Sequence, residues 1–184
     1  MAKAKQEKLN TKSHHRWVIL IIIAAFLISI FMSFISEKLL DNASILISLI
    51  VLIVIVLIGI FGDALGMAVS VADDRPFHSM ASAKVIGASK SLYLIKNASK
   101  VANIFGDVIG DICGIISGTS AALIIVNMST LYPTRDFAIA SLLLSGFVAS
   151  ITIGGKAAGK EIAMNYSKEI VLATGKIMAF FSRD

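Results

Sequence analysis

The sequence predicts an all-α membrane protein with about four transmembrane helices and juxtamembrane amphipathic helices on the cytoplasmic side. Three observations lead to this fold class. Hydrophobic residues make up 57% of the 184-residue chain, charged residues make up 16%, and the mean hydropathy is +0.85. Four apolar runs approach or exceed the ~20 residues that cross a hydrocarbon core of about 30 Å. The basic residues fall almost entirely on one side of these runs. The natural solvent of such a chain is mostly lipid.

The apolar runs set the expected order of elements. They lie at Trp17–Ile35, Ile45–Ala72, Val101–Met128 and Phe137–Ile153. We expect a basic cytoplasmic tail, an N-terminal transmembrane helix, a membrane domain containing a cytoplasmic helical loop, and a C-terminal amphipathic helix. The corresponding residues are 1–16, 17–36, 45–155 with its loop at 73–100, and 156–184.

The two amphipathic segments have different sequence signals. Apolar residues of the loop are interspersed with Ser, Ala and Lys, and Gly87 divides the loop into two expected short helices. The C-terminal segment repeats apolar residues at intervals near 3.6, at Ile162, Tyr166, Ile170, Ala173, Ile177 and Phe181. Both patterns favour helices that lie on the inner membrane surface or contact a partner.

The basic residues predict the orientation of the chain. The N-terminal tail, the middle loop and the C-terminal tail each hold five Lys or Arg residues, which leaves only Lys38 and Arg135 for the two outer turns. Because cytoplasmic loops retain positive charge, both termini and the middle loop are expected in the cytoplasm. The chain is therefore predicted to be a multi-pass protein of the inner (cytoplasmic) membrane, embedded in the lipid bilayer.

Several function classes have no sequence support. The formal charge of +5 divides evenly among three segments without interleaved aromatic residues, so we expect no nucleic-acid partner. The single Cys113 can form no intrachain disulfide. Because no Ser-His-Asp, metal-His or phosphate-loop signature is present, we expect no enzymatic activity.

Three aspartates in the apolar runs are the candidate functional residues. Asp107 and Asp111 stand four residues apart and share one helical face, and Asp63 lies in a Gly-rich patch of the preceding run. Because these two runs adjoin the same inner loop, we expect Asp63 to face Asp107 or Asp111 at a similar depth. An aspartate near the centre of a membrane helix costs roughly 2.5–3.5 kcal/mol on insertion scales, so a cation, a proton or a paired base is expected beside it. Hard divalent cations prefer oxygen ligands, and hydroxyls such as that of Ser70 could complete a site.

Two other interpretations of these acids remain open. The carboxyl groups could be protonated or paired with Lys156 or Lys100 as internal links between helices. They could also relay protons, although no histidine or glutamate extends the series of acids.

Three short motifs follow one another in the chain: Phe61-Gly62-Asp63-Ala64, the segment from Gly106 to Asp111, and residues 155–163. In these motifs the chain resembles the membrane domain of the CorC/CorB and CNNM (cyclin M) family of magnesium transporters. That family carries a Gly-Asn motif with a second Asn four residues later, and Gly106-Asp107-Val108-Ile109-Gly110-Asp111 matches it with Asp in place of each Asn. Phe61-Gly62-Asp63-Ala64 can be aligned with the turn that bears a metal-binding Ser. The last family motif, Gly-Glu-x-x-Pro-Lys-x-x-Ala, is matched by residues 155–163, with Lys156 in place of Glu and Gly159 in place of Pro.

The resemblance, which covers roughly residues 45–180, implies a homodimer that exports Mg²⁺, coupled to Na⁺ entry. It implies that Asp63, which stands for the metal-binding Ser, coordinates the ion together with Asp107 and Asp111 and with backbone oxygen from Gly155. The first transmembrane helix is an addition to the family pattern, and we expect no nucleotide-binding CBS pair.

The rival hypothesis is a non-transporting membrane protein that senses cations or serves as a scaffold for an unidentified membrane or cytoplasmic partner. In that protein a structural ion or Asp–Lys pairs would occupy the acidic site.

Overall fold

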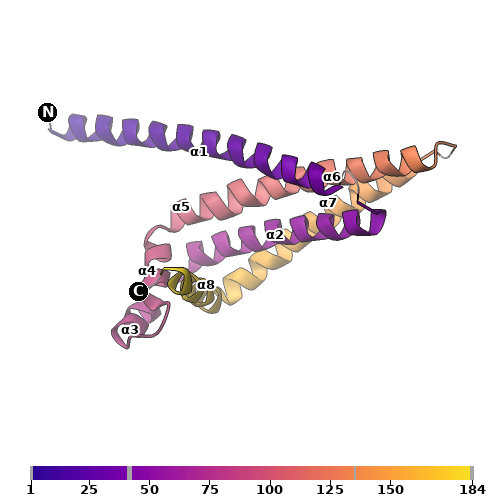
Figure 1. Ribbon diagram of the computed structural model, residues 1–184. Coiled ribbons are helices and arrows are strands. Elements are labelled where there is room, and N and C mark those ends of the chain that lie inside the picture. Colours follow the sequence, from indigo (N-terminus) through magenta and orange to yellow (C-terminus); the bar gives the residue numbers. More distant parts are fainter. Residues whose placement is uncertain (1, 41–42, 135, 183–184) are drawn as a thin grey trace.

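The computed structural model describes residues 2–40, 43–134 and 136–182, and these residues contain helices but no strand (Figure 1). Four helical stretches are long and apolar enough to cross a membrane. They are Val18–Lys38 within α1 (Ala2–Leu40), α2 (Ile45–Val71), the continuous stretch Ala98–Leu131 and α7 (Ala138–Asn165). The predicted fold class is confirmed. Arg135, which the sequence assigns to the second outer turn, lies outside the described residues.

The third membrane-length stretch changes its helical type along its course. It begins as α5 (Ala98–Ala102), continues as the π-helix η1 (Asn103–Ile109), and becomes α6 (Gly110–Leu131). π-Helical turns are rare and occur frequently at functional sites. Asp107 lies within η1, and Asp111 lies in the first turn of α6.

Helix α2 contacts η1, α6 and α7, and α7 crosses α2 to reach α6, which it also contacts (Figure 1). Glycines permit this close contact, because an added Cβ at Gly62 would lie 2.8 Å from the carbonyl oxygen of Phe105. At Gly66 it would lie 3.1 Å from the backbone nitrogen of Gly106. Backbones can approach in this way where small residues line a helix crossing.

Helix α1 joins the bundle mainly through α6 and diverges from it toward the N-terminus (Figure 1). The hydroxyls of Ser36 and Ser120 form a buried hydrogen bond of 2.8 Å near the C-terminal end of α1. The structure also extends α1 back to Ala2, so the basic tail predicted at residues 1–16 belongs to this helix from residue 2 onward.

Three short helices form a base at one end of the bundle. They are α3 (Arg75–Ser82), α4 (Ala88–Lys96) and α8 (Ser167–Phe181), and together with the adjoining turns of α2 and α7 we call them the helical base. Gly87, where the sequence predicts a break in the middle loop, has a φ of +87°, a left-handed conformation that suits glycine. Phe77 of α3 and Val171 of α8 are fully buried in one cluster with Ala68 of α2. The predicted loop helices and C-terminal helix therefore contact one another.

The C-terminal segment differs from its predicted boundaries. We expected an amphipathic helix from residue 156, but α7 continues without interruption to Asn165 and only then gives way to α8. Gly155 and Gly159 do not end α7 because they lie against Ile60 of α2, whose side chain occupies the space that a Cβ at either position would need.

Helix α8 is apolar on two sides. Val171 and Gly175 are buried against the base, whereas Tyr166, Ile177 and Phe181, which belong to the predicted 3.6-residue stripe, are exposed. Among the stripe residues, Ile170 packs against the cluster that contains Phe77 and Val171, and the other five are exposed.

Helices α4 and α8 cross through a contact without space for a side chain, which yields a stability prediction. A Cβ at Gly175 would overlap the Oγ of Ser91, whose buried hydroxyl donates to the carbonyl oxygens of Gly87 and Val171, each at 3.0 Å. We expect Gly175→Ala to destabilise the protein by about 1–3 kcal/mol through overpacking. This loss can be measured by thermal unfolding, with the reaction of the buried Cys113 with a thiol dye as the signal for unfolding.

Gly146→Ala is the matched control because an added Cβ at Gly146 in α7 meets no atom within 4 Å. That substitution should preserve or slightly raise the unfolding temperature, since Ala favours a helix interior. Equal unfolding temperatures for the two variants would contradict the tight crossing.

Candidate cation site

Each of the three central membrane helices has an uncharged stretch that ends at the side facing the helical base. These stretches contain 18, 20 and 18 residues and lie at 45–62, 112–131 and 138–155. At the rise of an α-helix they are about 27–30 Å long. This length matches the hydrocarbon thickness of a bilayer.

Five charged residues lie within five positions of these ends, and we call them the charge belt. They are Asp63 of α2, Asp107 of η1, Asp111 of α6, and Lys156 and Lys160 of α7. We expected Asp107 and Asp111 within the apolar centre of a span, but the structure has a longer helix of 34 residues and sets them in its first half. The belt accordingly corresponds to the edge of the apolar zone, where charge costs less because side chains can reach headgroups or water.

Asp63 lies in the space left by two glycines of the neighbouring helix. If Gly106 carried a Cβ atom, that atom would lie 3.4 Å from Asp63 Oδ1. A Cβ atom added at Gly110 would lie 3.6 Å from the Cβ of Asp63. Only 9% of the residue is exposed. The sequence places Asp63 at the level of the other two acids, and the structure brings it there, but glycines rather than aspartates face it.

Lys160 is the countercharge of Asp63. Its Nζ lies 3.2 Å from Asp63 Oδ2, which makes an ion pair by distance. The same Oδ2 is buried and has no hydrogen-bond partner, so the ammonium group is close to this oxygen without the alignment of a hydrogen bond. One carboxylate oxygen deep in the crossing is thus neutralised but left without a directed donor, which is costly for a buried oxygen.

Lys156 is the countercharge of Asp111. Its Nζ donates a hydrogen bond of 3.0 Å to Asp111 Oδ1. The Lys156 side chain is only 20% exposed, whereas that of Asp111 is 71% exposed. This is the Asp–Lys pairing that the sequence leaves open as an alternative to an ion site. Among the described residues, no ion pair joins the exposed Asp107 to a lysine or arginine.

The two ion pairs adjoin one another. Lys156 Nζ and Asp63 Cβ would both lie within 3.6 Å of a Cβ at Gly110, so these two atoms are at most about 7 Å apart. The described residues of α2, α6 and α7 therefore hold a connected row in which acids and lysines alternate.

The remaining predicted ligands lie away from this row. The Ser70 hydroxyl donates to the carbonyl oxygen of Gly66 in its own helix, at 2.9 Å. Gly155 lies within continuous helix and packs on Ile60. The described residues contain no group of three or more His, Cys, Asp and Glu side chains gathered as for a metal ion. Coordination by Asp63, Asp107 and Asp111 together stays a prediction.

Sequence reasoning overlooked Lys160 as a partner, although a signal for it exists. Each belt residue directly follows a glycine: Gly62-Asp63, Gly106-Asp107, Gly110-Asp111, Gly155-Lys156 and Gly159-Lys160. Both pairs on α7 repeat the four-residue spacing of the pairs on the third helix. Since a glycine that faces another helix sets the next residue about 100° away, the Gly-Lys repeat indicates lysines at the edge of the same crossing.

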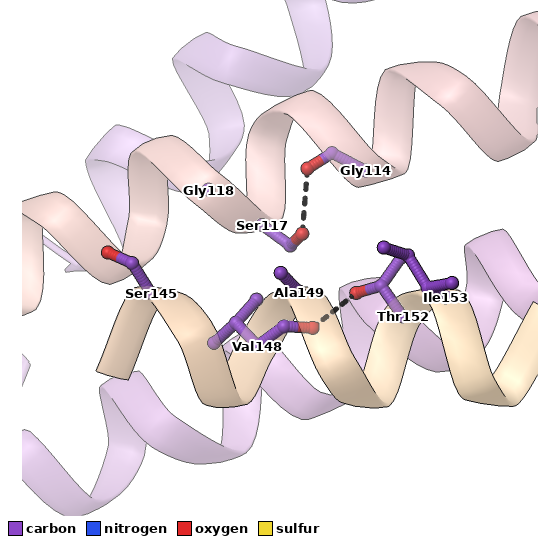
Figure 2. A pocket seen from close by; sticks show the side chains of 8 residues that line it. All are labelled: Gly114, Ser117, Gly118, Ser145, Val148, Ala149, Thr152 and Ile153. Carbon is purple, nitrogen blue, oxygen red and sulfur yellow. Dashed lines mark hydrogen bonds between the residues drawn. The ribbon is translucent and has the colours of Figure 1, made fainter. Parts of the chain in front are cut away.

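A cavity of about 180 Å³ lies between α6 and α7, one turn from the Asp111–Lys156 pair (Figure 2). Small residues, three hydroxyl-bearing side chains and the apolar Val148 and Ile153 line it. The hydroxyls of Ser117 and Thr152 donate to carbonyl oxygens of their own helices at 2.8 Å, as Figure 2 shows. No carboxylate lines it. Gly114 and Gly118 on this side have open space where a Cβ would be, which suits a close contact with a second helix. A homodimer stays a prediction.

The described fold defines an all-α membrane protein in which α2, the third helix and α7 carry five charged residues at one shared edge of their uncharged stretches. No protein-family model, curated protein or solved structure matches the chain. The similarity to magnesium transporters therefore rests on the sequence motifs alone.

The buried ion pair yields a second stability prediction. Lys160→Gln leaves the Asp63 carboxylate without its countercharge and should destabilise the protein by about 1–3 kcal/mol, below the range for a fully buried pair because Lys160 is partly exposed. Asp63→Asn introduced into that variant should recover most of the loss, since no buried charge remains. Thermal unfolding of the two single variants and the double variant measures the coupling. Additive effects of the two substitutions would show that the pair contributes no coupling.

Proposed function

We propose that the chain is a divalent-cation transporter of the inner membrane, with Mg²⁺ as its cargo and Na⁺ as the coupled ion. The observation that carries this proposal is the buried Asp63 Oδ2, which lies at the edge of the apolar zone with a lysine beside it and no hydrogen bond. A carboxylate oxygen in that state is available to a cation that approaches from the side of the helical base.

The surroundings of Asp63 support the same proposal. Gly106 and Gly110 keep side chains away from its carboxylate, and Asp107 follows one of these glycines on a π-helical turn. Carboxylates with nearby backbone carbonyls supply the hard oxygen donors that Mg²⁺ prefers, and retained waters can complete its octahedron. The sequence motifs shared with magnesium transporters add support, because Asp63, Asp107 and Asp111 are their matched positions.

The Asp–Lys pairs favour a second candidate function. In a non-transporting membrane protein, the Asp63–Lys160 and Asp111–Lys156 contacts would simply tie α2 and α6 to α7. The helical base would then present its exposed α8 stripe to a partner or to lipid. Both candidates need the same residues, so flux separates them.

Proteoliposomes that contain a magnesium-sensitive dye test the transporter directly. Under an imposed Mg²⁺ gradient with Na⁺ on the opposite side, the unmodified chain should produce flux. Asp63→Asn and Asp107→Asn should each lower the rate by about tenfold or more, because each removes a charged oxygen from the path of a divalent ion. Glu169→Gln is the matched control, since it neutralises an exposed acid on α8 outside the charge belt.

One result would contradict transport. Flux equal to that of empty liposomes under Na⁺, proton and voltage gradients, from protein that unfolds cooperatively, would leave the non-transporting candidate.

The proposed orientation has its own test. With buried Cys113 replaced by Ala, an impermeant maleimide should label Thr134→Cys in intact cells but label Ser82→Cys only after permeabilisation. The reason is that the basic residues hold the helical base in the cytoplasm. If Ser82→Cys were labelled in intact cells and Thr134→Cys only after permeabilisation, the helical base would lie outside the cytoplasm. The proposed entry of the cation from the cytoplasmic side would then be wrong.

A further inference from the structure

The charge belt has a net charge that is mismatched to a divalent ion. Asp63, Asp107 and Asp111 carry three negative charges, and Lys156 and Lys160 carry two positive charges, so the belt sums to −1. Addition of Mg²⁺ with both lysines in place would give +1 at the edge of the apolar zone. Departure of one lysine would bring the sum to zero. Asp63 is the buried acid of the belt, and Lys160 already lies beside its Oδ2. A divalent ion at the same oxygen would be repelled by the ammonium group, so exchange is favoured over simple addition.

The two lysines differ in how easily they can leave. Lys156 is hydrogen-bonded to Asp111 and its side chain is 20% exposed. Lys160 is 44% exposed, one helical turn nearer the helical base, and its contact with Asp63 is not an aligned hydrogen bond. A lysine has a flexible four-carbon stem that can carry its ammonium group into water. Lys160 is thus the residue that can move away at low cost.

The carboxylate also needs Lys160 when no cargo is present. Asp63 is buried against Gly106 and Gly110, and an unpaired charge there would destabilise the helix crossing. A transport cycle passes through an empty state, so the site requires a countercharge that can be replaced by the ion and can then return.

Resting on the proposed function, we infer that Lys160 is a tethered competitor of the transported cation. Its ammonium group occupies the position beside Asp63 Oδ2 in the empty state, and the divalent ion enters this position as Lys160 turns toward the helical base. Lys156 stays with Asp111 throughout and acts as the fixed countercharge.

Amine reactivity of the unmodified full chain tests the movement. The protein in lipid nanodiscs is treated briefly with an acetylating reagent, with and without saturating Mg²⁺, and each lysine is quantified by mass spectrometry. Acetylation of Lys160 should rise several-fold with Mg²⁺, whereas that of Lys156 and of exposed Lys168 on α8 should not change. Equal Lys160 reactivity in both states, in protein that binds Mg²⁺, would overturn the exchange.

Mg²⁺ affinity measured by calorimetry provides a second readout. Lys160→Gln should bind Mg²⁺ about tenfold more tightly, because the competing charge is gone. Lys160→Arg should bind no more tightly than the unmodified chain, because a guanidinium group also pairs with carboxylates. Lys168→Gln is the control for loss of a surface charge and should leave the affinity unchanged.

The outcomes separate this inference from the proposed function. If the chain binds Mg²⁺, loses binding in Asp63→Asn, and shows the same affinity in Lys160→Gln, the competitor role fails and the transporter proposal stands. If neither the unmodified chain nor Lys160→Gln binds Mg²⁺, both fail. If Lys160→Gln does not fold, the acetylation of the unmodified chain decides.

Discussion

The close approach of α2 to the third helix and to α7 is the constraint on which the rest of the structure depends. Gly62 and Gly66 let the α2 backbone touch that of η1, while Gly155 and Gly159 receive Ile60. Because a charged residue follows nearly every glycine in these crossings, packing and electrostatics are set by the same positions. A larger residue in place of such a glycine would separate the helices and the ion pairs together.

The helix crossings also explain how the chain carries five charges beside its apolar helices. The uncharged stretches of α2, α6 and α7 end at one level, so the charges meet each other instead of being spread over the spans. Below that level, the last turns of α2 and α7 are covered by α3, α4 and α8, with Phe77 and Val171 at the centre. The apolar residues in these last turns, which lie beyond the uncharged membrane stretches, are thereby buried by protein.

Much of the fold could be read from the sequence because membrane helices are signalled by local composition. The four spans, the break at Gly87 and the shared level of Asp63, Asp107 and Asp111 all follow from run lengths and spacing. The end of α7 could not be predicted, because glycines such as Gly155 and Gly159 favour the end of a helix. In the structure they lie within α7, and the Ile60 side chain packs in the space beside them. The packed side of α8 could not be predicted either, because the regular apolar stripe contains one residue that packs inside the chain, Ile170, and exposed residues such as Ile177 and Phe181.

The sequence by itself determined the fold class, the order of the helices and the confinement of acids and lysines to the ends of uncharged stretches, because these depend on length, hydropathy and charge along the chain. Only the tertiary structure decided that Lys160 pairs with Asp63 and Lys156 with Asp111, and that Asp107 remains outside both pairs. The physical reason is that helix rotation and depth are fixed by contacts between glycine-lined surfaces far apart in the sequence.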